Sequence, residues 1–300
     1  MKTLLILTGP TGVGKTEFSL QLAEAIGSPI ISADSRQIYK ELPIGTAAPT
    51  AAEQARIKHY FVGTHSITDT YTAGQYERDV MKLTDKLFLT HDILLMTGGS
   101  MLYIDAVCNG LDDLPTIPPI CHQTVEREYK TLGIEHLQEQ LQMLDPEYYE
   151  RVDKQNPQRL MHAIEITLTA GKPYSSLLTG EKKDRPFRYI IIVLDREREE
   201  LYKRINKRVD IMLNTGLEEE ARNVYHLKEL NSLNTVGYKE LFAYFDGAIT
   251  RDEAIRLIKQ DTRHYAKRQL TWWRRRLETD KNVYWKSAED ITINKIKRLI

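Results

Sequence analysis

The sequence has few cysteines, no excess of either charge and no long apolar run. Cys108 and Cys121 are the only cysteines among 300 residues, too few for a disulfide framework or, alone, for a four-ligand zinc site. Lysine plus arginine and aspartate plus glutamate both total 42, so a nucleic-acid site must come from local clustering of basic residues. No segment approaches the ~18 apolar residues that a membrane-spanning helix needs. We therefore expect a soluble, cytoplasmic protein without a membrane segment, acting as a monomer.

The most informative stretch is the glycine-rich segment 9–16, which directly follows the apolar run 4–7. Its sequence, GPTGVGKT, fits the phosphate-binding loop pattern G-x-x-x-x-G-K-[ST] at every fixed position. Glycines let successive backbone N–H groups turn toward one point, and the helix that begins there directs the positive end of its dipole at the same point. Lys15 is expected to reach the outermost phosphates, and the Thr16 hydroxyl to bind a magnesium ion. The predicted phosphate-binding residues are Gly9, Pro10, Thr11, Gly12, Val13, Gly14, Lys15 and Thr16.

Two polar residues follow other predicted strands at the sheet edge where ligands bind in such folds. Asp34 follows the short apolar run 29–33, and it could be a magnesium ligand, a helix cap or a catalytic base. Ser100 follows the run 92–96 and a Gly-Gly pair that lets backbone approach a ligand closely. Its hydroxyl either contacts that ligand or caps the helix that follows.

The order of the expected elements predicts an α/β fold, with a P-loop NTPase-like parallel sheet flanked by helices. Strand-like runs occur at 4–7, 29–33, 59–65, 92–96 and 189–194, separated by helical patterns. Between 116 and 186 only helical patterns occur. We therefore predict a core domain of residues 1–115 and 187–300, interrupted by an all-helical insertion domain of residues 116–186. After the last of these runs the pattern is mainly helical, with helices expected at 201–213, 217–230, 251–277 and 291–300.

The long helix contains a basic segment, residues 263–276, with six Lys or Arg and no acidic residue. Aromatic side chains lie between the cations, a composition that suits phosphate neutralisation and base stacking. The alternative is an ordinary helix whose Tyr265, Leu270 and one tryptophan pack inward while the arginines face water. Adjacent helix positions point about 100° apart, so at most one of Trp272 and Trp273 needs to face RNA.

Three functions are compatible with these features. A small-molecule kinase would bind ATP in the loop and use Asp34 as a base or metal ligand. A transferase would use the loop to hold a diphosphate leaving group while it transfers a carbon fragment. A non-catalytic RNA-binding protein would retain the loop without turnover. Only an RNA-modifying transferase needs both the helical insertion and the basic helix.

Eight stretches taken together resemble the bacterial tRNA dimethylallyltransferase (tRNA isopentenyltransferase) family along nearly the whole chain. They are GPTGVGKT (9–16), ADSRQIY (33–39), IGTA (44–47), GGSMLY (98–103), NPQRLMHAIE (156–165), the Arg204/Arg208 helix with Met212 and Gly216, VGYKE (236–240) and YAKRQLTWWRR (265–275). Taken singly, only the first stretch is specific to a class of protein. The number and order of the eight stretches make the whole set specific to this family.

The resemblance implies transfer of the dimethylallyl group of dimethylallyl diphosphate to the exocyclic amine of the adenine 3′-adjacent to the anticodon. It implies Asp34 as the base, Ser100 near the reacting oxygen or amine, Arg208 rather than Arg204 on the diphosphate, and Mg²⁺ as cofactor. It also implies that the insertion grips the tRNA anticodon stem-loop. The implied tRNA-binding residues are Asp34, Ser35, Arg36, Gln37, Ser100, His122, Gln158, Arg159, Leu160, Met161, His162, Lys267, Arg268, Gln269, Leu270, Thr271, Trp272, Trp273 and Arg274.

Several positions depart from the family pattern. Ser100 stands where threonine is usual, which keeps the hydroxyl, and Ala48 replaces a common lysine. His122 and His162 lie where arginines often contact tRNA, and His264 where glutamine is frequent. These changes reduce fixed positive charge, so we expect RNA binding to be less salt-dependent than in arginine-rich relatives.

Overall fold

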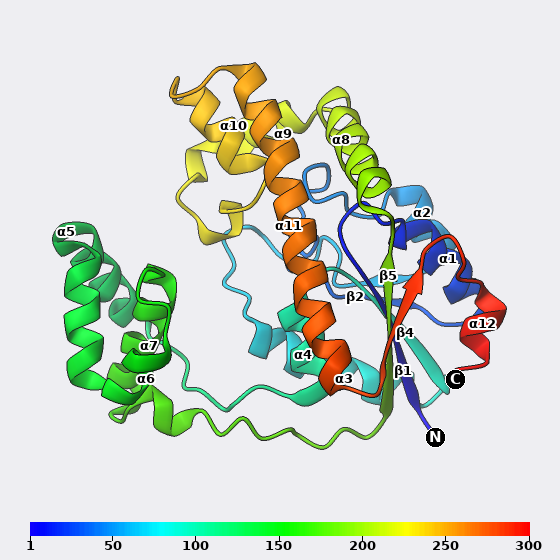
Figure 1. Cartoon of the computed structure of the whole chain (residues 1–300), viewed down its shortest axis with the longest axis horizontal. Helices are drawn as coiled ribbons and strands as arrows, with labels where there is room; N and C mark the ends of the chain where they lie inside the picture. The colour runs from blue at the N-terminus through cyan, green and yellow to red at the C-terminus, as the bar shows by residue number, and fades with distance from the viewer. The chain divides into compact units, whose positions relative to one another are not determined.

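The computed structural model describes all residues 1–300, and a six-stranded parallel sheet is the central element of the part formed by residues 1–109 and 184–300 (Figure 1). The strand order is β3-β2-β4-β1-β5-β6, and every neighbouring pair is parallel. The predicted fold class is therefore confirmed. The strands are β1 Thr3–Thr8, β2 Ile30–Ser32, β3 His59–Tyr60, β4 Ile93–Thr97, β5 Arg188–Asp195 and β6 Val283–Ser287.

Both faces of the sheet are covered, which is why its central strands consist of almost unbroken apolar residues. Alternate residues of β1 enter different cores: Leu4 and Ile6 belong to one apolar cluster, Leu5 and Leu7 to the other. The helices of this part of the chain are α1 Lys15–Ile26, α2 Ala51–Arg56, α3 Ala73–Leu87, α4 Met101–Asn109, α8 Arg198–Asn214, α9 Leu217–Val224, α10 Tyr238–Phe245, α11 Arg251–Thr279 and α12 Ile293–Lys297.

The predicted elements differ from the structure in four places. No strand was predicted after 194, yet β6 (283–287) pairs with β5. Val283 is buried in one apolar core, Trp285 packs against that core and Tyr284 against the other. The helix predicted at 217–230 ends at Val224, where 3₁₀ turns at 225–227 and 231–233 follow. The final helix covers only Ile293–Lys297 of the predicted 291–300. The short strand β3 occupies two residues of the predicted 59–65.

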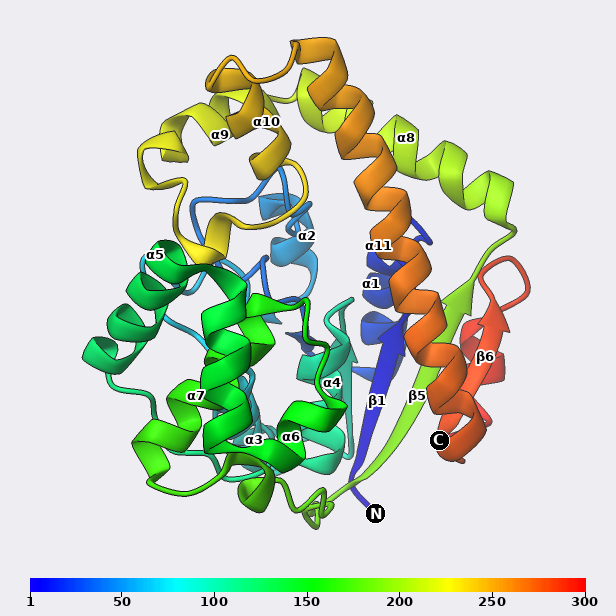
Figure 2. The ribbon, with the colours of Figure 1, turned by 60° about the vertical axis from the view of Figure 1, so that its left-hand side comes forward.

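The chain divides into two compact units, one made of residues 1–109 and 184–300, the other of residues 110–183. The second unit, the helical insertion, contains α5 Pro119–Leu144, α6 Pro146–Arg151, α7 Pro157–Ala170 and a 3₁₀ helix at Tyr174–Leu177 (Figure 2). Two helices predicted at 125–132 and 137–144 are the halves of α5, which is broken at Gly133 by a backbone φ of 85°. The insertion has an apolar core of its own, which includes the fully buried Leu137, Leu141 and Leu160.

No helix of the structure combines the length and the apolar character required to cross a membrane.

Candidate phosphate and transfer site

The phosphate loop connects the end of β1 to the start of α1 and has the backbone that its glycines permit. Gly9 and Gly14 have φ values of 142° and 109°, a region that other residues rarely adopt. A Cβ atom on Gly9 would lie 2.5 Å from the backbone oxygen of Leu194 on β5, so close packing against the sheet also requires glycine there. The strand end, the loop and the helix N-terminus thus occur in the order that the motif predicts.

Lys15 folds back over the loop. Its Nζ donates hydrogen bonds to the backbone oxygens of Gly9 at 2.8 Å and Pro10 at 3.0 Å. Burial, and then the positive charge of Arg208, lower the pKa of Lys15 to about 7, while the Asp34 carboxylate acts in the opposite direction. A bound anion would restore the charge of this amine and draw it away from the carbonyls.

Three arginines from the region after β5 hold the outer side of the loop. Arg196 Nε donates to the backbone oxygen of Val13 and Arg204 Nε to that of Gly12, both at 2.8 Å. Arg208 Nη1 lies 3.3 Å from Thr11 Oγ1, and burial lowers the pKa of Arg208, with Asp34 opposing that effect. Arg204 is exposed whereas Arg208 is partly buried, a difference that supports Arg208 as the diphosphate ligand.

Asp34 forms a tight turn at the carboxyl end of β2. Its Oδ1 accepts hydrogen bonds from the backbone N–H groups of Arg36 at 2.9 Å and Gln37 at 3.2 Å. Both bonds use the same oxygen, so Oδ2 remains available to a ligand in the cavity that Asp34 lines. The capping role and a catalytic role are therefore compatible in one carboxylate.

Ser100 is only 9% exposed and fixes this turn from the neighbouring strand end. Its Oγ accepts a hydrogen bond from the Ser35 backbone N–H at 2.8 Å and donates one to Ser35 Oγ at 3.0 Å. Neither bond caps the N-terminus of α4, so the Ser100 hydroxyl orients the Asp34 turn instead of capping the helix that follows it.

Asp195 is the last residue of β5, the position at which a motor or switch NTPase would carry a metal-linked aspartate. Its Oδ1 accepts from the Arg196 backbone N–H at 2.8 Å, and its Oδ2 from Trp285 Nε1 at 3.1 Å. Both oxygens therefore attach β6 and the following loop to β5. The structure contains no group of three His, Cys, Asp or Glu side chains suited to a metal ion.

One cavity of about 1130 Å³ joins the phosphate loop to the Asp34 turn. Its polar end contains Lys15, Arg208 and Asp34. Its other walls come from the loop at 45–47 and from apolar side chains of α8 and its neighbours, namely Val209, Met212, Leu217, Val236 and Ile258. The cavity thus combines an anion-binding end, a carboxylate and an apolar wall.

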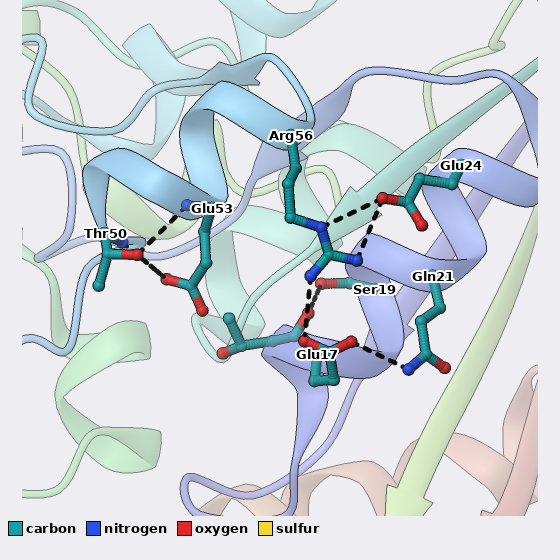
Figure 3. Close-up of polar contacts among 8 residues, drawn as sticks. Glu17, Ser19, Gln21, Glu24, Thr50, Glu53 and Arg56 are labelled. Atoms are coloured by element: carbon teal, nitrogen blue, oxygen red, sulfur yellow. Dashed lines mark hydrogen bonds and ion pairs between the residues drawn. The ribbon is translucent and has the colours of Figure 1, made fainter.

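The acidic rim of the cavity was not predicted from the sequence. Glu17 and Glu53 line the cavity, and Arg56 of α2 binds Glu17 at 3.3 Å and Glu24 at 3.1 Å (Figure 3). These exposed pairs add little stability, because water and salt screen the attraction between their charges. They join α2 to α1 at the mouth of the cavity.

Gln37 also has a different position from the one its predicted RNA contact suggested. Its Nε2 donates to the backbone oxygens of Thr46 at 3.1 Å and Ala47 at 3.0 Å. Ala47 has a φ of 48°, unusual for a residue with a side chain, so Gln37 stabilises a strained part of the cavity wall.

Arg196 and Tyr265 line the cavity as well, and sequence reasoning missed both as site residues. Arg196 could have been found, because it follows the strand-like run 189–194 at the same sheet edge as Asp34. Tyr265 carried no such signal beyond its place in the basic helix.

The basic segment of α11 divides into two faces. Lys267, Arg268, Thr271 and Arg274 are exposed. Trp273 and Gln269 are each 1% exposed, and Leu270 and Trp272 are partly buried. The contact predicted between RNA and the side chains of Trp273 and Gln269 is therefore corrected: these side chains pack inward and do not belong to the exposed face of α11.

The predicted contact residues of the insertion divide in the same way. Gln158, Arg159, His122 and His162 are exposed, and His122 Nδ1 lies 2.7 Å from Glu165 Oε1. Leu160 and Met161 are 0% and 3% exposed and belong to the core of the insertion. They face inward on α7, so they too are corrected to packing residues.

In this parallel sheet the first strand leads directly into a phosphate loop, and a carboxylate follows the end of the second strand. This arrangement defines a P-loop protein that acts on a phosphorylated ligand. A family model described as IPP transferase matches residues 37–276. The chain belongs to this family, that of the tRNA dimethylallyltransferases, as the sequence motifs predicted.

Relatives and solved structures agree with this assignment. A Porphyromonas gingivalis protein named tRNA dimethylallyltransferase 2 is 54% identical over 283 residues, covering 94% of this chain and 93% of its own. A Bacteroides fragilis protein named tRNA dimethylallyltransferase 1 is 53% identical over 284 residues, covering 95% and 93%. The structure of a Bacillus halodurans tRNA isopentenylpyrophosphate transferase is similar with a TM-score of 0.70 and 31% identity, covering 100% of this chain and 94% of that one. A eukaryotic dimethylallyltransferase that acts on tRNA shares the fold, with a TM-score of 0.80 at 24% identity.

Proposed function

We propose that this protein transfers the dimethylallyl group of dimethylallyl diphosphate to the exocyclic amine of the adenine 3′-adjacent to the anticodon. The allylic C–O bond breaks, an N–C bond forms, the amine loses a proton and diphosphate leaves. One observation carries the proposal: a single cavity holds a phosphate loop, a carboxylate with an available oxygen and an apolar wall. The names of the relatives supply the identity of the substrates.

The loop would stabilise the leaving group. Negative charge accumulates on the diphosphate as the C–O bond breaks, and preorganised N–H groups and cations lower that barrier. The loop amides, Lys15 and Arg208 line the same end of the cavity. Hydrogen bonds from Arg204 and Arg196 to the loop carbonyls would hold those amides in place before the donor arrives.

Asp34 would accept the proton of the amine. The lone pair of an adenine amine is delocalised into the ring, so removal of its proton in the transition state assists attack. Backbone N–H groups bind Asp34 Oδ1, and the hydroxyl of Ser100 fixes the adjoining Ser35. This leaves Oδ2 as the oxygen that would face the amine.

The five-carbon group would lie against the apolar side chains of Val209, Met212 and Leu217, which line the same cavity as Lys15, Arg208 and Asp34. The adenine would have to leave its stack in the anticodon loop, at a cost of a few kcal/mol. Contacts to RNA must offset this cost. We propose that they come from Ser35 and Arg36 and from the exposed residues of α11 and of the insertion, which would grip the anticodon stem-loop.

A magnesium ion fits the donor set that the chain offers. Mg²⁺ commonly takes one or two protein ligands and completes its shell with substrate phosphates and waters. The exposed hydroxyl of Thr16, at the mouth of the cavity, would supply the protein ligand. When bound, the ion would neutralise part of the diphosphate charge. We propose that the protein works as a monomer and in the cytoplasm, where tRNA is found.

The decisive experiment uses dimethylallyl diphosphate labelled in its carbon chain, Mg²⁺ and unmodified tRNA. We expect the label in the RNA and stoichiometric release of diphosphate. A kinase would instead consume ATP, and a non-catalytic binder would retain RNA without releasing diphosphate. Folded protein that binds tRNA but incorporates no label would refute the proposed function.

A further inference from the structure

Gln269 lies in the middle of the basic segment of α11, yet it does not belong to the exposed face. Its neighbours Arg268 and Lys267 are exposed, whereas Gln269 itself is 1% exposed. A buried polar side chain must have hydrogen-bond partners, so its contacts indicate its role.

Both ends of the Gln269 amide are used, and they join two separate strand ends. Oε1 accepts a hydrogen bond from the Thr11 backbone N–H at 2.9 Å. Nε2 donates to the backbone oxygen of Gly99, also at 2.9 Å. The opposite orientation of the amide would place donor against donor and acceptor against acceptor, so this arrangement is the one that satisfies all four groups.

The two partners of Gln269 lead to the two halves of the site. On one side, Thr11 belongs to the phosphate loop, and its hydroxyl contacts Arg208. On the other, Gly99 precedes Ser100, which fixes Ser35 and with it the Asp34 turn. One buried amide therefore connects the loop for the leaving group to the strand end that orients the proposed base.

The Gln269 amide approaches Gly99 so closely that a side chain at position 99 would displace it. A Cβ atom at this position would lie 2.5 Å from Gln269 Nε2, too short for any real contact. Tyr265 from the preceding turn of α11 also directs its hydroxyl to the Gly99 oxygen, at the longer distance of 3.4 Å. The link is thus dominated by Gln269, and it can be broken from either side.

We propose that Gln269 is a positioning residue of the donor site and not a contact for RNA. Its Oε1 holds the Thr11 backbone N–H toward α11. This fixes the loop backbone, so that the N–H groups after Thr11 stay directed at the diphosphate. Through Gly99, Gln269 also keeps the distance between the loop and the Asp34 turn. This inference rests on the proposed function, in which the loop binds a diphosphate and α11 binds RNA.

The test separates affinity for diphosphate from affinity for RNA, and neither measurement needs turnover. Gln269→Met keeps the side-chain volume but removes both hydrogen bonds. Inorganic diphosphate with Mg²⁺ and an anticodon stem-loop RNA are titrated separately by calorimetry. We expect affinity for diphosphate to fall about tenfold, because two buried groups lose their partner, while affinity for RNA stays within twofold.

Two further variants make the outcome unambiguous. Gly99→Ala leaves Gln269 in place but displaces its amide, so it should reproduce the loss of diphosphate affinity even if Gln269→Met does not fold. Gln260→Met makes the same chemical change on α11, where Gln260 contacts only Arg256, and should alter neither affinity.

Loss of RNA affinity with unchanged diphosphate affinity in Gln269→Met would overturn the proposal, as would unchanged diphosphate affinity in both Gln269→Met and Gly99→Ala. Failure of the proposed function is a different result, since it would be seen as absence of label in RNA with the unmodified protein.

Discussion

The phosphate loop and the helical insertion hold their functional candidates in different ways. In the loop, backbone atoms and cations are already fixed by other residues, such as Arg196, Arg204 and Gln269, before any ligand binds. In the insertion, Gln158 and Arg159 stand on the surface, and the residues that follow them on α7 form its core. In the proposed function, the loop would thus be preorganised for one small anion, whereas the insertion would offer separate side chains to a large one.

This difference matters for how each region would contribute. Preorganised groups act on the charge that develops during reaction, so their loss should reduce turnover by orders of magnitude. Separate surface cations bind phosphates additively, so the loss of one should reduce affinity only a few-fold. The following predictions test this contrast.

The largest effect is expected for Asp34→Asn. Asparagine keeps an oxygen that can accept from Arg36 and Gln37, but it cannot take a proton from the amine. We expect the rate of label transfer at saturating substrates to fall by about 10² to 10⁴, the usual contribution of a general base. Affinity for tRNA should be largely intact, as measured by filter binding.

Asp34→Ala provides the comparison for the turn, because it removes the acceptor as well as the base. It should lose at least as much activity as Asp34→Asn while still binding tRNA. Near-normal turnover in either variant would remove Asp34 from the proposed mechanism.

The next effect concerns stability in the insertion. Leu160→Ala removes a fully buried side chain from a small core and should destabilise this unit by about 2–5 kcal/mol, whereas Gln158→Ala should change it by no more than about 0.5 kcal/mol. Amide hydrogen exchange of α5 and α7 measures both. Because the cavity lies in the other unit, diphosphate affinity should be unchanged; a parallel loss would show that the two regions are not independent.

The same contrast explains what the sequence could predict. The spacing of Gly9, Gly14, Lys15 and Thr16 is set by phosphate geometry and by backbone conformation, so these positions follow from local sequence. The buried amide of Gln269 could not be predicted in its role, since its partners are 258 and 170 residues away. The resemblance implies RNA contacts for the whole run 267–274, and Gln269 is included only through its place in that run.

Resemblance to a family had a similar limit in the insertion. The stretch 156–165 resembles the family as one motif, and the resemblance implies RNA contacts for a contiguous run of its residues. A helix has an exposed and a buried face, so any contiguous run on it contains buried residues, here Leu160 and Met161. In the sheet, β6 was missed because only Val283 among its five residues is buried. The contact residues that are exposed remain predictions.

A smaller effect is expected from pH at the loop. The pKa of Lys15 in the free protein lies near 7, below its ordinary value of 10.5, and a bound anion favours the charged amine. Below pH 7 the Lys15 amine is already charged before the anion binds, so it adds no pH dependence to the affinity for diphosphate. Above pH 7 binding must take up a proton, and affinity for inorganic diphosphate should fall by up to about tenfold per pH unit.

Lys15→Arg is the matched control, since arginine stays charged throughout this range. Titrations at pH 6–9 of both proteins with the same ligand cancel the ionisation of the diphosphate itself. Identical pH profiles for the two proteins would contradict a lowered pKa at Lys15.

The smallest effects should come from single surface cations, and they decide whether the insertion binds RNA in the same manner as α11. Arg159→Ala and Arg268→Ala each remove one exposed charge, and each should weaken binding of the stem-loop a few-fold. If each arginine neutralises one phosphate, the slope of log affinity against log salt should become shallower by about 0.7 to 0.9 in each variant and by the sum in the double variant. A normal slope for Arg159→Ala with a reduced one for Arg268→Ala would confine the electrostatic contact to α11. The insertion would then contribute shape and not charge.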